Sequence, residues 1–76
     1  MNNARRKAIE LARDTLESIK GDIETLRDEE QEYIDNMPES LQQSERASTA
    51  ESAVSSLDEA VNSLDEAISS LESAEE

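Results

Sequence analysis

The sequence predicts an all-α fold, an antiparallel two-helix coiled-coil hairpin with helices at about 4–34 and 48–75. A heptad occurs three times near the C-terminal end, as Ala53-Val-Ser-Ser-Leu-Asp-Glu, Ala60-Val-Asn-Ser-Leu-Asp-Glu and Ala67-Ile-Ser-Ser-Leu-Glu-Ser. Its β-branched residue at each a position and leucine at each d position are typical of a helix that packs along one apolar seam. A second apolar period precedes these heptads, and a proline separates the two segments.

The first helix is predicted over residues 4–34, because its apolar residues advance by three and four positions from Ile9 to Tyr33. Glu30 occupies an a position, where we expect it to reach solvent past the small Ala50 on the other helix. The helix is expected to stop before Pro38, because the residue before a proline avoids the helical region.

Residues 35–47 are predicted to form a loop that includes a short helical turn from Pro38, since proline suits the first position of a helix. Ser48 and Glu51 have the spacing of a capping box, which predicts that the second helix begins at Ser48. Two long helices joined by about ten residues form an antiparallel hairpin, so residues 1–76 are expected to be one domain.

The charged residues predict the register of the hairpin. The e positions of antiparallel helices face each other, and here they are basic in the first helix and acidic in the second. The pairs have residue numbers that add to 85: Arg13 with Glu72, Lys20 with Asp65, and Arg27 with Asp58. The same register predicts apolar layers that add to 80: Ile9 with Leu71, Ala12 with Ile68, Leu16 with Leu64, Ile19 with Val61, Ile23 with Leu57 and Leu26 with Val54. Arg5 would then lie opposite Glu75.

The second helix is apolar over a wider face than a two-stranded coiled coil requires. Alanine occupies its g positions, at Ala53, Ala60, Ala67 and Ala74. Small residues let another helix approach closely, and a chain of 76 residues buries little apolar surface as a lone hairpin. We therefore expect a homo-oligomer, most simply a dimeric four-helix bundle with these alanines at its interface. Their alternative role is that of good helix formers alone.

Composition excludes several classes of function. The formal net charge is −13, with +2 in residues 1–20 and −15 in residues 21–76, which argues against direct nucleic-acid or anionic-membrane binding. No apolar run has the length of a membrane span, so we expect a soluble cytoplasmic protein. The chain has no cysteine, histidine, tryptophan or phenylalanine and no phosphate-binding glycine loop. We therefore expect no enzyme activity, no cofactor and no metal site.

A distinctive segment joins the two predicted helices. Residues 29–46 read Glu-Glu-Gln-Glu-Tyr-Ile-Asp-Asn-Met-Pro-Glu-Ser-Leu-Gln-Gln-Ser-Glu-Arg, and the Leu-Asp-Glu-Ala heptads follow. From about Leu16 to its end, the chain resembles small acidic helical-hairpin proteins encoded by bacteriophages and prophages. The resemblance implies the cytoplasm of a bacterial host and brings no assigned activity.

The leading functional hypothesis is a non-enzymatic binding protein, an inhibitor of a host factor or defence system that acts through an acidic surface. In its strongest form the acidic rows mimic nucleic acid, and in the alternative they only keep the protein soluble. The candidate protein-interaction residues lie on the second helix and in the loop: Asp58, Glu59, Asp65, Glu66, Asn36, Met37, Pro38 and Glu39.

Two other hypotheses remain open. The chain could be an oligomeric sponge for a nucleotide-like signalling ligand, since an anion between protomers could be held by basic side chains. The candidate anion-binding residues are Arg5, Arg6, Lys7 and Arg13, with Arg46 near the loop as a further cation. Otherwise, the chain could be a structural or assembly coiled coil whose function is association itself.

Overall fold

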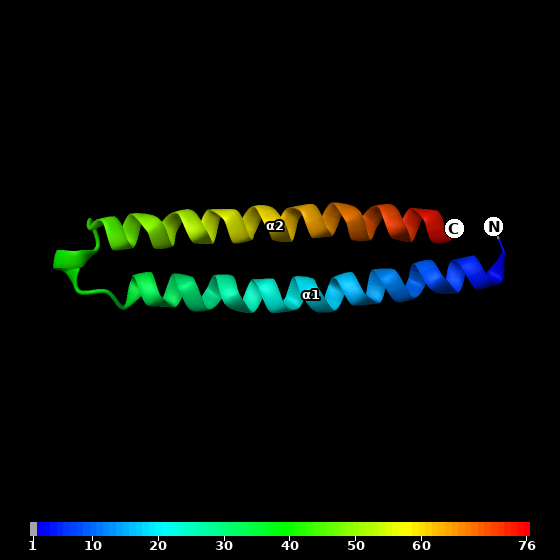
Figure 1. Cartoon of the computed structure of the whole chain (residues 1–76), viewed down its shortest axis with the longest axis horizontal. Helices are drawn as coiled ribbons and strands as arrows, with labels where there is room; N and C mark the ends of the chain where they lie inside the picture. Colours follow the sequence, from blue (N-terminus) through cyan, green and yellow to red (C-terminus); the bar gives the residue numbers. More distant parts are fainter. Residues whose placement is uncertain (1) are drawn as a thin grey trace.

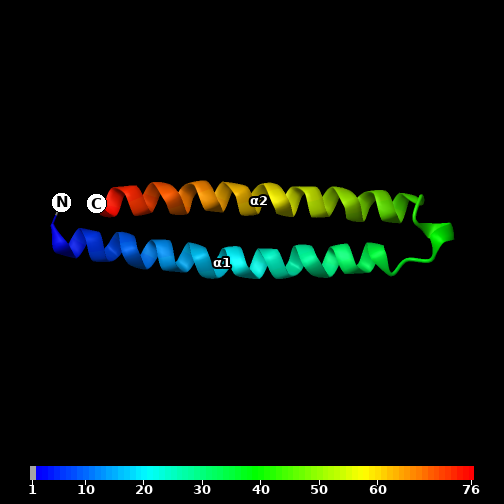
Figure 2. The same cartoon turned by 180° about the vertical axis from the view of Figure 1, so that it is seen from behind.

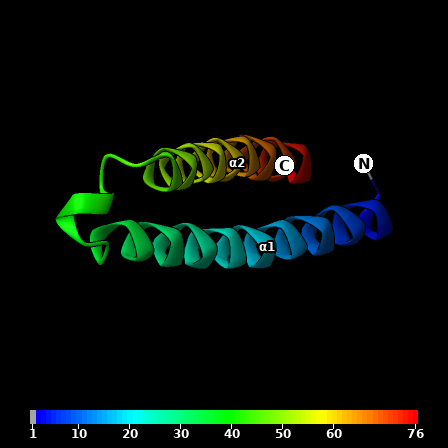
Figure 3. The ribbon, with the colours of Figure 1, turned by 60° about the vertical axis from the view of Figure 1, so that its left-hand side comes forward.

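Residues 2–76 of the computed structural model form two long helices and one short 3₁₀ turn. These elements are α1 (Asn3–Asp35), η1 (Glu39–Leu41) and α2 (Glu45–Glu75). The helices α1 and α2 run side by side in opposite directions along a rod of 60 × 14 × 12 Å (Figures 1 and 2). Both chain ends lie at one end of the rod, and η1 lies beyond the helices at the other (Figure 3). The prediction of an all-α helical hairpin is confirmed.

The first helix has the predicted bounds to within one residue at each end. Asn2 caps its start, because its side-chain oxygen accepts a hydrogen bond from the backbone N–H of Arg5 at 2.7 Å. After Asp35, the N–H of Met37 still donates to the carbonyl of Ile34 at 3.1 Å. Pro38 is extended, with φ −57° and ψ 144°, and has no N–H to continue the helix.

The second helix begins at Glu45, so the predicted start at Ser48 is wrong by three residues. Ser44 is the N-cap, and its Oγ accepts a hydrogen bond from the N–H of Ala47 at 3.3 Å. The N–H of Ser48 donates to the carbonyl of Ser44 within the helix. Ala47 is fully buried, so the extra turn stabilises the hairpin by packing an apolar side chain that a loop would leave in water.

The buried core is small and concentrated at the loop end. Ile34, Met37, Ala47 and Ala50 are buried there. Farther along α2, buried residues occur at the a positions Val61 and Ile68. The d-position leucines of α2 are half-buried: Leu57, Leu64 and Leu71. The hairpin therefore has a closed end and a thinner apolar seam along its length.

The helix α1 is rotated relative to the predicted seam. We call the residues at its d positions the α1 apolar row: Ala12, Ile19, Leu26 and Tyr33. This row was predicted to lie in the core, and that prediction is wrong, because Ile19, Leu26 and Tyr33 are 42%, 53% and 45% exposed. The e positions are covered in its place: Arg13, Lys20, Arg27 and Ile34. Exchanging d for e corresponds to a rotation of about 50°, given 3.6 residues per turn.

The long basic side chains account for this rotation. Lys20 and Arg27 have only 28% and 26% of their side chains exposed, while their charged ends contact carboxylates on α2. Lysine and arginine can lay apolar stems over a surface and keep their heads in water. The apolar stems of these lysine and arginine side chains thus cover the seam on one side. On the other side, the α1 apolar row is rotated into solvent.

Candidate functional site

Ion pairs on one edge of the hairpin confirm most of the predicted register. Lys20 Nζ contacts Asp65 Oδ1, and Arg27 Nη1 contacts Asp58 Oδ1 at 3.0 Å, as expected. The third pair differs, because Arg13 Nη1 contacts Glu75 Oε2 at 2.8 Å and not Glu72. Glu75 lies at an a position with 22% of its side chain exposed, so its carboxylate meets Arg13 close to the seam between the helices. Glu72, at an e position, is exposed.

These ion pairs neutralise the cations in the middle of the rod. The hydrogen bond from Lys20 to Asp65 raises the pKa of the lysine above its usual range, against the opposing effect of partial desolvation. The pKa of Arg27 is raised for the same reason, by hydrogen bonds to Asp58 and then to Asp28. Both side chains therefore remain cationic and committed to carboxylates of this chain at neutral pH.

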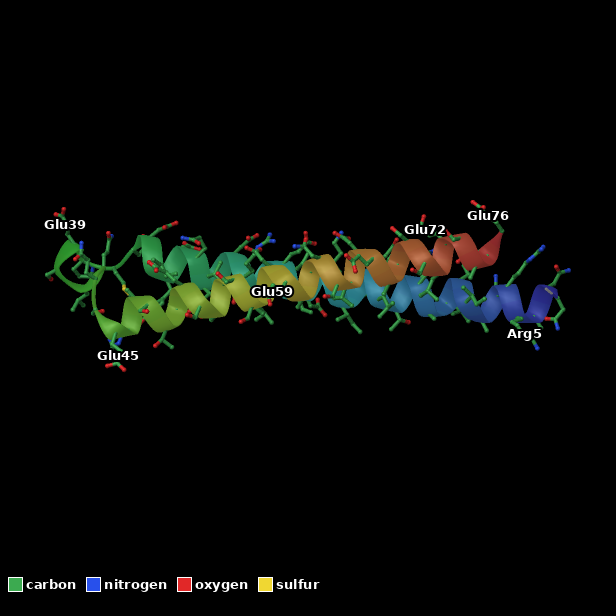
Figure 4. The ribbon with its side chains drawn as sticks, turned by 90° about the horizontal axis from the view of Figure 1, so that it is seen from above. Arg5, Glu39, Glu45, Glu59, Glu72 and Glu76 are labelled. Atoms are coloured by element: carbon green, nitrogen blue, oxygen red, sulfur yellow. The ribbon has the colours of Figure 1, made fainter. Side chains whose placement is uncertain are left out.

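The acidic row predicted on α2 divides into two kinds of side chain. Asp58 and Asp65 accept the ion pairs and keep 51% of each side chain exposed. Glu59 and Glu66 are exposed, and neither has an ion pair among residues 2–76. Figure 4 shows carboxylates directed away from the rod at both ends, including Glu39, Glu45 and Glu76. An approaching molecule therefore meets negative charge on several sides.

The charge is unevenly distributed along the rod. The loop end, residues 27–53, carries eight acidic and two basic residues, a net charge of −6. The terminal end, residues 1–13 with 66–76, carries five acidic and four basic residues, a net charge of −1. The two ends lie at opposite extremes of the molecule (Figure 1). The hairpin is thus strongly acidic at one end and nearly neutral at the other.

The basic residues at the terminal end do not gather into one group. Arg5, Arg6 and Lys7, which we call the basic turn, are exposed in the first turns of α1, and Arg5 is seen at the tip of the rod in Figure 4. Arg6 Nη2 donates to the carbonyl of Glu76 at 3.5 Å, a contact near the predicted pairing of Arg5 with Glu75. Arg13 is instead held by Glu75 and by Asp14, at 2.8 and 3.1 Å.

The loop residues proposed for protein interaction also divide. Met37 is 8% exposed and packs in the core, whereas Asn36, Pro38 and Glu39 are exposed. The amide of Gln42 donates to the carbonyl of Met37 at 3.2 Å, which holds the loop against the end of α1. Met37 therefore closes the hairpin, and only its neighbours are available at the surface.

Two hollows meet at the loop end, around residues of the distinctive segment. The larger, which we call the loop-end groove, has a volume of about 520 Å³ and is lined by Glu30, Tyr33, Glu45, Arg46, Thr49, Ala50 and Ala53. The smaller has about 300 Å³ and is lined by Tyr33, Asn36, Met37, Pro38, Leu41 and Arg46. Both contain Tyr33 and Arg46. Sequence reasoning treated Tyr33 only as a heptad residue, although a lone aromatic at a d position was a usable signal.

The alanines of α2 border the same face of the hairpin as the α1 apolar row. We call Ala53, Ala60, Ala67 and Ala74 the alanine row. Ala53 and Ala60 are half-exposed, and Ala67 and Ala74 are exposed. Ala53 and Tyr33 line the same groove, so the two rows meet at the loop end. Together they form an apolar face with large side chains on one helix and small ones on the other.

Two further properties hold for residues 2–76. No three acidic side chains come close enough together to hold a metal ion. No helix has both the length and the apolar character needed to cross a membrane. The fold and its charges define an acidic antiparallel helical hairpin. Comparisons with protein-family models, curated proteins and solved structures give no match.

Proposed function

We propose that this chain is a non-enzymatic binding protein, a dimeric four-helix bundle that binds a basic partner protein through its acidic surface. The observation that carries the proposal is the commitment of Lys20 and Arg27 to carboxylates of the same chain, which leaves Glu59 and Glu66 exposed and unmatched. An array of unmatched carboxylates attracts a cationic surface and speeds its association.

The resemblance to phage proteins supports a setting for this activity. A small acidic protein made in an infected bacterium meets host proteins in the cytoplasm, and many nucleic-acid-binding proteins carry basic surfaces. The proposed partner is therefore a basic host factor or defence protein, which the chain inhibits by covering its cationic site. If that site normally binds nucleic acid, the acidic rows act as a mimic.

Surface area supports the dimeric bundle. The hairpin exposes 5430 Å², whereas a folded monomer of 8.4 kDa is expected to expose about 4,600 Å². The excess of about 800 Å² equals the area that one partner contributes to a standard protein interface. The exposed Ile19, Leu26 and Tyr33 of the α1 apolar row contribute apolar area that a second copy would cover.

A charge-neutralising variant tests the acidic surface. Glu59→Gln with Glu66→Gln keeps the shape of α2 and removes two exposed charges, while Glu17→Gln with Asp22→Asn removes two exposed charges from α1 as a matched control. Each protein is used to capture partners from a bacterial lysate at low and high salt. We expect a basic protein that binds the wild type and the control, is lost with the α2 variant, and is released by salt. The proposal would be refuted if the captured protein bound the α2 variant as well as the wild type and stayed bound at high salt.

One observation favours a second candidate function, the sponge for a nucleotide-like ligand. Tyr33 and Arg46 line both hollows at the loop end, and an aromatic ring beside a guanidinium can stack a base and hold a phosphate. Glu30 and Glu45 in the groove oppose this role. Calorimetric titration with cyclic dinucleotides, compared between wild type and Arg46→Ala, decides it. Heat of binding that Arg46→Ala abolishes supports the sponge, and no heat with the wild type removes it.

A further inference from the structure

The α1 apolar row needs an occupant that matches its length and spacing. Ile19, Leu26 and Tyr33 recur every seven residues on the exposed side of α1, with Ala12 one heptad earlier. A row with this period packs best against another helix with the same period. The chain itself supplies such a helix, and a second copy brings an identical row.

We infer that a second copy of this chain docks antiparallel on this face, so that the basic turn of each copy lies against the loop-end groove of the other. The inference rests on the proposed dimeric bundle. It adds which face of the hairpin is covered, how the two copies are oriented and which residues face each other. It also completes a site, because the groove gains cations that its own chain places at the far end of the rod.

Charge determines the direction. Two hairpins can stack with their loops at the same end or at opposite ends, and both arrangements give antiparallel neighbouring helices. With the loops together, two ends of net charge −6 lie side by side at the helix spacing of about 8–10 Å, which is close to the screening length of about 8 Å at physiological salt. With the loops apart, each −6 end meets a −1 end whose exposed residues include Arg5, Arg6 and Lys7. Electrostatic complementarity favours the second arrangement.

Side-chain size permits both arrangements, because the α1 apolar row would meet the alanine row with the loops together, so the direction rests on charge. We place the two-fold axis that relates the two copies beside Ile19. Each residue of the α1 apolar row then faces the partner residue for which the two residue numbers add to 38. Ile19 meets the partner's Ile19, and the 53%-exposed Leu26 meets the partner's Ala12, a large side chain against a small one. Each such pair buries apolar surface without a clash. The same axis brings the alanine rows of the two α2 helices together near Ala60, where small side chains allow close approach.

The end of the row forms the completed site. The same numbering places the partner's Arg5 at Tyr33, on the edge of the loop-end groove. Tyr33 is 45% exposed, and a guanidinium binds well over the face of a tyrosine ring. Glu30 and Glu45 line the groove and supply carboxylates for the basic turn. The acidic groove of the single hairpin is therefore well suited to an arginine of a second copy.

Single cysteines test the direction, because the chain has none of its own. Ile19→Cys should form a disulfide-linked dimer under mild oxidation, since the two copies meet at this residue, whereas the outward-facing Glu17→Cys should not. A mixture of Leu26→Cys with Ala12→Cys should give the mixed dimer. In the arrangement with loops together, Leu26 faces Ala53 of the other copy, so a mixed dimer of Leu26→Cys with Ala53→Cys would overturn the inference.

Mass and salt separate this inference from the proposed bundle. Light scattering that shows a wild-type monomer refutes the bundle and the inference together, whereas a dimer without the Ile19→Cys linkage refutes only the inference. Arg5→Glu with Arg6→Glu should weaken dimerisation by about tenfold or more, because it places like charges at both groove contacts. Two copies of net charge −13 repel each other in either arrangement, so the informative quantity is the difference in salt response between the wild type and this variant. Added salt should therefore strengthen the Arg5→Glu, Arg6→Glu dimer more than the wild-type dimer, and an equal response of the two proteins would contradict the inference.

Discussion

Truncation of two similar side chains, Ile68→Ala on α2 and Leu26→Ala on α1, should have very different effects in the single hairpin. The heptad pattern alone places both residues in the seam and predicts similar losses. In the structure, Ile68 is 6% exposed and Leu26 is 53% exposed. The comparison therefore measures the rotation of α1 directly.

The magnitudes follow from the buried area. Ile68→Ala removes three carbon groups that are almost wholly covered, and at about 0.8 kcal/mol for each the loss is about 2.4 kcal/mol before any cavity cost. Leu26→Ala removes a similar side chain of which about half is covered, so the loss is about 1 kcal/mol. For a domain of this size, the melting temperature should fall by about 10–20 °C in the first variant and about 4–8 °C in the second.

Thermal unfolding followed by circular dichroism at the lowest usable protein concentration gives both values. The loss caused by Leu26→Ala should grow as the protein concentration is raised, because a second copy covers this residue in the proposed dimer, whereas the loss caused by Ile68→Ala should be large throughout. Equal losses at low concentration would refute the rotated packing of α1, because they would mean that Leu26 is as buried as Ile68.

Other substitutions test the ion pairs, the cap and the helix interior. Lys20 has a raised pKa when folded, so its pairing with Asp65 should stabilise the protein below the unfolded lysine value of about 10.4 and lose this effect as pH rises through the folded value. The difference in unfolding free energy between wild type and Lys20→Met should therefore shrink between neutral and strongly alkaline pH, and a constant difference would contradict the pairing. Ser44→Ala should cost about 1 kcal/mol in urea unfolding because it removes the N-cap, while Ser48→Ala should cost almost nothing. Gly21→Ala should raise the free energy of unfolding by about 0.5–1 kcal/mol, since the added methyl meets no atom within 4 Å, and a loss would contradict the helical geometry there.

The hairpin could be predicted from the sequence because its determinants are local or pairwise. The seven-residue period fixes the helix type, and Pro38 fixes the break between helices. The pairs Lys20–Asp65 and Arg27–Asp58 were predictable because antiparallel e positions face each other and opposite charges leave one consistent register.

The start of α2 was predicted three residues too late, because the local capping pattern favours a serine that is not the cap. Ser48 has the better capping-box sequence, with Glu51 three residues later. Ser44 is the cap, because the turn that it adds buries Ala47 at the closed end. Burial at the end of a hairpin depends on the path of the loop, and no local pattern contains that information.

The rotation of α1 was missed for a different reason. A heptad pattern shows that an apolar stripe exists, but a basic residue beside the stripe can cover the seam with its stem. Arg13, Lys20 and Arg27 do so along one side of α1 and displace the d positions into solvent. The loop-end groove was missed as well, because it forms where Tyr33 and Ala53 meet across the two helices.

Charge acts within the hairpin and, in the dimer that we propose, between hairpins, and at both levels it selects among packings that apolar contacts make possible. Within the hairpin, the lysine and arginine pairs of α1 select the register of the seam. Between hairpins, two copies carry −26 together, twice the −13 of one chain, so association depends on apolar burial and on matching each acidic loop end to a basic turn. That match consumes the exposed cations of the terminal end and leaves Glu59 and Glu66 unmatched on each copy. Dimerisation would thus make the remaining surface more uniformly acidic, which is the property that binding a basic partner requires.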